Sequence, residues 1–135
     1  MFSLNEVIDK SKIEPFGLNE KADGQFIPDT FRHEHYLVIS ERGKRIVISG
    51  CSHKGVVNIA DSLRPDVLIG GFHYSKIDSA SGVLDKRAEK LLQTGAAFFT
   101  CHCTGEEQYE YMKKIMHPRL NYISAGDIVK IEDTK

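Results

Sequence analysis

The stretch "RIVISGCSHKGVVNIADSLRPDVLIGGFHYS", residues 45–75, decides the fold class of this chain. It begins with an apolar run over 45–50 and ends with a second apolar run over 66–72. Between them, apolar residues recur at helical spacing and share one face: Val56, Ile59, Ala60 and Leu63. A strand, a helix and a second strand in this order are typical of a parallel βαβ unit with a right-handed crossover.

The sequence on either side of this stretch continues the alternation. Upstream, apolar runs at 36–40 and 45–49 flank Gly43, which suits a tight hairpin turn. Downstream, the pattern predicts a helix over 84–94, a strand over 96–101, a helix over 104–117 and one or two strands over 120–133. We therefore expect an α/β fold with a mixed sheet, in which a starting hairpin is followed by parallel βαβαβ units.

The N-terminal segment, residues 1–30, carries much weaker patterning than the rest of the chain. Its "SLNE" motif, Ser3 to Glu6, can form a capping box for a short helix. Residues 15–29 contain two prolines and two glycines, which predicts a loop. We expect one domain over 1–135, with the α/β core in 31–135.

The composition limits the classes of function. A formal net charge of −1 over 135 residues argues against a protein that binds nucleic acid or a membrane surface. No apolar run reaches the length of about 18 residues that a membrane span needs, and the N-terminus has no signal-peptide pattern. Three cysteines without a disulfide framework fit a reducing compartment, so we expect a cytoplasmic protein.

Three predicted parallel strands end in turns rich in glycine, histidine and cysteine: residues 49–55, 70–75 and 100–105. In an open α/β sheet, ligands bind outside the carboxyl ends of the strands. We therefore expect one sheet edge to gather His53, His73 and His102, with Cys51, Cys101 and Cys103 beside them. The helix N-termini that follow these turns favour an anion, which indicates a small anionic substrate or ligand.

The "TCHCTG" turn invites a reading as a compact metal cluster, but strand geometry predicts otherwise. Side chains alternate along an extended segment, which places Cys101 and Cys103 on one side and His102 on the other. Free cysteines are also commonly buried packing residues. With Thr104 and Glu107 as a capping box, the turn is expected to lead directly into the next helix. The pattern thus favours one metal ligand from each strand end over a cluster within one turn.

The remaining histidines have structural explanations. A single histidine at a strand end is more often a hydrogen-bonded structural residue than a ligand, although three at equivalent positions favour a site. His33 and His35 form an H-x-H pattern that we expect to be exposed on an edge strand. His117 falls at a predicted helix C-terminus, where its charge would complement the helix dipole.

Five segments of the chain, in order and spacing, resemble the C-terminal half of a metallo-β-lactamase-fold hydrolase. They are "FIPDTFRHEHYLVI" (26–39), "GKRIVISGCSHKGVVNI" (43–59), "VLIGGFHYS" (67–75), "HCTG" (102–105) and "SAGDIVKI" (124–131). Their branch is similar to the one related to dihydropterin/ribofuranosylaminobenzene-phosphate synthase. The resemblance implies half of an αββα sandwich with a metal centre, often zinc, at the strand ends. It also implies hydrolysis of a phosphoester or related ester by a metal-activated water.

The same resemblance implies roles for particular residues. The "GCSH" turn matches the position of the family's bridging-ligand motif, which implies Cys51 and His53 as metal ligands. His102 of "HCTG" matches the final metal-histidine motif. His73 of "GGFH" marks this branch and is expected to contact substrate as a catalytic group.

The chain departs from the family because the main metal motif, H-x-H-x-D-H, does not occur in it. Three hypotheses follow and remain open. The chain can be a half-enzyme that works with a partner chain carrying that motif. It can instead be a truncated, non-catalytic homologue, stabilised as a homodimer that covers the exposed face of its sheet. It can also be a module that binds an anion or a single metal ion.

Overall fold

The computed structural model describes residues 17–131. The expected capping box at Ser3–Glu6 lies outside these residues. The elements in chain order are β1 Asn19–Ala22, β2 Gln25–Pro28, β3 Leu37–Glu41, β4 Lys44–Ile48, α1 Val56–Leu63, β5 Val67–Ile69, α2 Val83–Gln93, β6 Ala97–Thr100, α3 Glu106–Met116 and β7 Leu120–Tyr122. Short 3-10 turns, η2 Ser79–Ser81 and η3 His102–Thr104, precede α2 and α3. None of the described helices has the length and apolar character needed to cross a bilayer.

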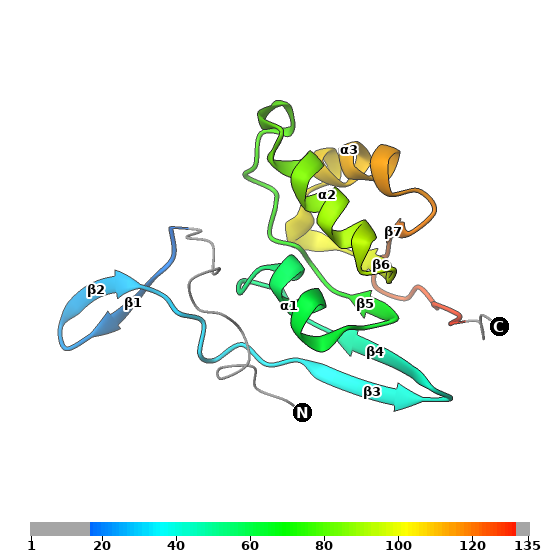
Figure 1. Cartoon of the computed structure of the whole chain (residues 1–135). Helices are drawn as coiled ribbons and strands as arrows, with labels where there is room; N and C mark the ends of the chain where they lie inside the picture. The colour runs from blue at the N-terminus through cyan, green and yellow to red at the C-terminus, as the bar shows by residue number, and fades with distance from the viewer. Residues whose placement is uncertain (1–16, 132–135) are drawn as a thin grey trace.

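The main sheet is mixed and has the strand order β3-β4-β5-β6-β7. β3 pairs with β4 in an antiparallel hairpin, and β4 to β7 pair in parallel. The three α-helices lie on the same side of this sheet (Figure 1). The starting hairpin and the parallel βαβαβ units predicted from the sequence are therefore confirmed.

The core lies between the sheet and the helices. Val47, Leu68, Phe98 and Leu120 are register partners on neighbouring strands, and each is at most 1% exposed. The helices cover them with the apolar stripes that the sequence predicts, and the fully buried members are Val56, Ile59, Ala60, Leu84, Ala88, Leu91, Met112 and Met116. Each large apolar side chain buried in this way stabilises the fold by about 1.5–3 kcal/mol.

The opposite face of the sheet is apolar and only partly covered. Leu37, Ile39 and Ile48 are 44%, 37% and 37% exposed. Alternation along β3 and β4 places these side chains on the face away from Val47. The segment 123–131 runs beside part of this face, because Ile131 lines the same hollow as residues of β4, β5 and β6.

Residues 15–29 were expected to be a loop, and that prediction is wrong for most of this range. β1 and β2 form an antiparallel hairpin whose turn is Asp23-Gly24, with φ of 48° and 81°. Asp-Gly is a strong signal for a two-residue hairpin turn. The flanking strands have no buried alternating residues, since all of β2 is exposed, so the hydrophobic pattern did not reveal them.

The expected capping box at Thr104 is wrong. α3 has Gly105 as its N-cap and no side-chain cap, so Thr104 does not cap the helix. The Thr104 hydroxyl instead accepts from the Phe72 backbone N–H at 2.9 Å and bonds the Thr100 hydroxyl. The one or two strands expected over 120–133 are a single strand in the described chain: β7 ends at Tyr122, and residues 123–131 form no second strand.

Candidate metal centre

The loops that follow β4, β5 and β6 lie together at one edge of the sheet. Backbone hydrogen bonds extend the parallel pairing into these loops: the N–H of Gly70 donates to Phe99 O at 2.9 Å, and the N–H of Gly71 donates to Gly50 O at 2.8 Å. The "GCSH", "GGFH" and "TCHCTG" turns are therefore held side by side. This is the edge at which the sequence predicted a site.

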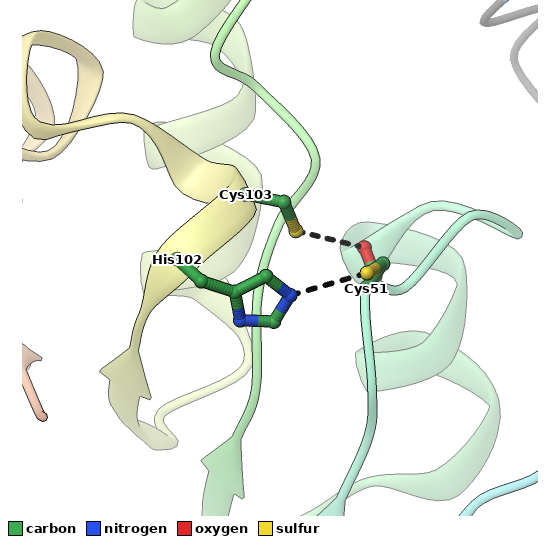
Figure 2. A group of neighbouring side chains, drawn as sticks. All are labelled: Cys51, His102 and Cys103. Carbon is green, nitrogen blue, oxygen red and sulfur yellow. Dashed lines mark hydrogen bonds between the residues drawn. The ribbon is translucent and has the colours of Figure 1, made fainter. Parts of the chain in front are cut away.

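One group of possible ligands consists of Cys51, His102 and Cys103. One donor atom from each residue lies within 4.8 Å of the others. Cys51 Sγ is 3.1 Å from His102 Nε2, and Cys103 Sγ approaches the Cys51 carbonyl oxygen at 3.8 Å. Figure 2 shows the imidazole edge and the Cys103 thiol both directed at the Cys51 loop.

A second group consists of Cys51, His53 and His73, whose donor atoms satisfy the same 4.8 Å limit. The rings of His53 and His73 meet edge to face, with centroids 4.6 Å apart. Burial lowers the pKa of His73, and the neighbouring His53 lowers it further. The two groups share Cys51, which makes its thiol the centre of the whole site.

The structure thus brings all four predicted site residues to one edge but does not place the predicted ligands in one group. Cys51 joins both groups. His53 pairs with His73, whereas His102 pairs with Cys103. Each group takes two residues from one turn and one from another, so neither group has the arrangement of one ligand from each strand end that the sequence predicted.

The alternation predicted for residues 101–103 is wrong. His102 begins the 3-10 turn η3 and has φ of 27°, so the chain is no longer extended there. This conformation turns His102 and Cys103 toward Cys51 together. Cys101 lies at the other edge of the same ring, with its Sγ 3.2 Å from His102 Nδ1.

Glu34 is a further residue of the site, and the sequence argument overlooked it. It is 8% exposed, and its carboxylate accepts the backbone N–H of His53 at 2.7 Å, the backbone N–H of Lys54 at 3.1 Å and the Tyr36 hydroxyl. His53 Nδ1 lies 3.3 Å from the same carboxylate. Glu34 lies two residues before the buried Tyr36, and residues two apart in an extended segment point to the same side. This spacing is the signal that could have revealed Glu34.

The neighbours of Glu34 behave as expected or add to the site. His33 and His35 are exposed, as the sequence predicted. Phe31 stacks on the His53 ring with centroids 4.9 Å apart. Glu34 and Phe31 together fix the orientation of His53, which leaves its Nε2 as the nitrogen available to a ligand.

The donor set suits zinc. In tetrahedral zinc sites, Zn–S bonds of about 2.3 Å and Zn–N bonds of about 2.0–2.1 Å separate neighbouring donor atoms by roughly 3.3–3.8 Å. The 3.1 Å between Cys51 Sγ and His102 Nε2 is close to that spacing. Burial raises the pKa of the Cys103 thiol to about 12, so its thiolate form needs a nearby positive charge. Thiol and imidazole donors at this separation fit a bound zinc ion.

Known proteins support a relation to metal-dependent hydrolases. No protein-family profile matches the chain. It is 29% identical, in an alignment that covers 96% of its length, to the 7,8-dihydropterin-6-methyl-4-(beta-D-ribofuranosyl)-aminobenzene-5'-phosphate synthase of Methanocaldococcus jannaschii. A crystal structure of a metal-dependent hydrolase of the β-lactamase superfamily superposes with a TM-score of 0.76 at 25% identity, over 94% of this chain. The chain is thus similar in fold and sequence to a hydrolase of the metallo-β-lactamase superfamily.

This relation confirms the resemblance stated from the sequence, including its branch and its half-sandwich fold. The chain spans about half the length of these relatives: it covers 48% of the synthase and 52% of the hydrolase chain.

Proposed function

We propose that the chain is the C-terminal half of a metal-dependent hydrolase that acts on a phosphoester or a related ester, and that it contributes part of the metal centre. The observation that carries this proposal is the pair of donor groups that share Cys51 at the carboxyl ends of the strands. The superfamily relation adds support, because the superposed neighbour is itself a metal-dependent hydrolase. In this proposal Cys51, His53 and His102 are metal ligands, and His73 contacts the substrate.

Zinc is the metal that we propose. Cysteine and histidine are its usual ligands in proteins, and carboxylate-rich sites that suit magnesium or calcium have a different composition. A bound zinc ion supplies a Lewis acid and lowers the pKa of a water molecule toward neutrality.

The residues of this chain have distinct tasks in the proposal. Glu34 holds the His53 ring through its Nδ1 edge, which leaves Nε2 as the nitrogen that would bind the metal. His73 lies against His53 with its ring edge to face, close enough for the two to meet the same small anionic substrate. Gly71 of the "GGFH" turn lets this turn pack closely against the next one, since a Cβ there would collide with Cys103 Sγ and lie 3.1 Å from His102 Cε1.

We propose that a second polypeptide covers the open sheet face and completes the active site. Leu37, Ile39 and Ile48 expose a contiguous apolar strip there, and two sheets that pack face to face bury such strips in the usual sandwich arrangement. A partner chain carrying the H-x-H-x-D-H motif would supply the ligands that this chain lacks. A second copy of this chain would cover the same face without supplying that motif.

The test is reconstitution. The reduced full chain is loaded with zinc and assayed on bis(p-nitrophenyl) phosphate, alone and mixed with the separately expressed half of the M. jannaschii synthase that this chain does not match. We expect hydrolysis only in the mixture. A His73→Ala variant should keep its zinc and lose the activity.

The result also discriminates between the alternatives. Mixtures that form a complex, contain zinc and hydrolyse neither phosphodiesters nor simple esters would contradict the hydrolase assignment. Such mixtures would favour a metal- or anion-binding module. A stable homodimer that excludes the added half would favour the non-catalytic homologue.

A further inference from the structure

We propose that Cys51, His102 and Cys103 form a three-ligand zinc site that this chain assembles by itself, with Cys103 as a ligand. The inference goes beyond the proposed function, in which the metal centre depends on a second polypeptide. It assigns to Cys103 a role that neither the strand pattern nor the superfamily motifs indicate. It also predicts that the isolated chain binds metal.

The first argument is that the η3 turn and the loop that carries Phe72 hold His102 and Cys103 next to Cys51. The η3 turn is closed by hydrogen bonds from Thr104 N–H to Cys101 O at 3.1 Å and from Gly105 N–H to His102 O at 3.3 Å. The buried Thr104 hydroxyl ties this turn to the Phe72 N–H of the neighbouring loop. His102 and Cys103 therefore face Cys51 before any metal binds, and little conformational entropy is lost on binding.

The second argument is the space around the thiol. A Cβ built on Gly71 would collide with Cys103 Sγ and would lie 3.1 Å from His102 Cε1. Gly71 has no positive φ, so its backbone conformation does not demand glycine. The absence of a side chain at residue 71 instead makes room for the Cys103 thiol and the His102 ring beside Cys51.

The third argument is that the two nitrogens of the His102 ring contact different cysteines. Nε2 faces Cys51 Sγ at 3.1 Å, and Nδ1 faces Cys101 Sγ at 3.2 Å. A metal ligand of this kind usually engages its second nitrogen with a neighbouring group, which fixes the ring and its tautomer. Cys101 is that neighbour and lies outside the donor group, although it is only two residues from Cys103.

The proposed binding step balances as an exchange of protons for zinc. Zn²⁺ replaces the protons of the two thiols Cys51 and Cys103, which pass to the buffer, and the neutral His102 contributes its Nε2 lone pair. The product has two thiolate bonds and one imidazole bond. Three protein ligands leave a fourth tetrahedral position open, as in catalytic zinc sites.

The experiment is a cobalt(II) titration of the reduced full chain without any partner, followed by zinc competition. We expect one cobalt ion per chain, with the near-ultraviolet charge-transfer absorption of two thiolate ligands and the visible bands of a tetrahedral site. Cys103→Ser should remove about half of the charge-transfer intensity and weaken binding at least about tenfold, by loss of one of three ligands. Cys101→Ser is the comparison for the number of thiolate ligands: at saturating cobalt it should leave the charge-transfer intensity unchanged, while loss of its contact with His102 Nδ1 weakens binding.

A second variant tests the same site without deleting a donor. Gly71→Ala should weaken cobalt binding about tenfold or more, although both thiol donors and the imidazole donor remain. Circular dichroism will show whether the fold is retained. Equal loss of charge transfer in Cys101→Ser and Cys103→Ser would overturn the assignment of Cys103. Failure of the reduced chain to bind cobalt or zinc would overturn the whole inference.

The outcome is separable from that of the proposed function. Metal bound only in the reconstituted pair, together with hydrolysis, would refute this inference and leave the hydrolase proposal standing. Metal bound by the chain alone, without hydrolysis by any mixture, would support this inference and refute the hydrolase proposal.

Discussion

Removal of the Glu34 carboxylate tests whether the "FRHEHYLV" segment stabilises the loop that carries His53 and Lys54. In Glu34→Ala, the buried N–H groups of His53 and Lys54 and the Tyr36 hydroxyl lose their acceptor. A buried donor left without a partner costs about 1–3 kcal/mol. Lys54, 2% exposed, also loses a nearby opposite charge. Relaxation and entering water offset part of the sum, so we expect the free energy of unfolding to fall by about 3–5 kcal/mol.

The assay is urea denaturation followed by circular dichroism, with metal removed by a chelator so that folding alone is measured. His35→Ala is the control, because its side chain is exposed next to Glu34 and such substitutions change stability by within about 0.5 kcal/mol. A loss below about 1 kcal/mol in Glu34→Ala, or one equal to that of His35→Ala, would refute the reasoning.

Glu34→Gln separates the structural task from the metal-related one. The amide keeps an acceptor for one backbone N–H but lacks the charge that faces His53 Nδ1. We expect most of the stability to return, with the zinc affinity of the reconstituted pair, in which His53 is a proposed ligand, about 10–100-fold weaker than with the parent chain, as for other lost partners of ligating histidines. Isothermal titration with zinc measures this, and unchanged affinity would show that Glu34 supports only the fold.

Three further predictions concern the scaffold. Thr104→Val should lower the free energy of unfolding by about 1–3 kcal/mol, because the buried Phe72 N–H loses its acceptor. Urea denaturation measures this loss, and an unchanged free energy of unfolding would contradict the anchoring role of the turn. Leu68→Ala should lower the free energy of unfolding by about 2–5 kcal/mol, because Leu68 is fully buried. Leu37→Ala should lower it far less, because Leu37 is 44% exposed. Equal losses would contradict the assignment of the two sheet faces. Ile39→Arg should abolish association through the open face in sedimentation velocity while leaving the far-ultraviolet spectrum unchanged, and an unaltered associated species would place the interface elsewhere.

The parallel core could be predicted from the sequence because burial and periodicity agree there. Val56, Ile59 and Ala60 recur at helical spacing, and the structure buries all three. The β1–β2 hairpin could not be found in this way, since its strands bury no alternating residues and their pairing depends on the Asp23-Gly24 turn. Hydrophobic patterning detects only those strands that contribute to a core.

The candidate site was predictable in its position but not in its membership. Topology places the ends of parallel strands at one edge, so His53, His73 and His102 could be placed there without coordinates. The membership of Cys103 depends on a local departure from extended backbone at His102, where φ is 27°. No periodic pattern encodes a single turn of this kind, and a prediction based on strand alternation had to assign Cys103 to the wrong side.

The two unusual features of the molecule bear on different steps of one assembly. The open sheet face offers Leu37, Ile39 and Ile48 to another sheet, and its burial would stabilise a complex whether or not a metal is bound. The donor groups at the sheet edge are held by hydrogen bonds within this chain, so their geometry does not require the complex. If both features act as we propose, metal loading and association are energetically separable. Zinc should then bind the Ile39→Arg variant as tightly as the parent chain, and a loss of zinc affinity with association would show that the site is built across the interface.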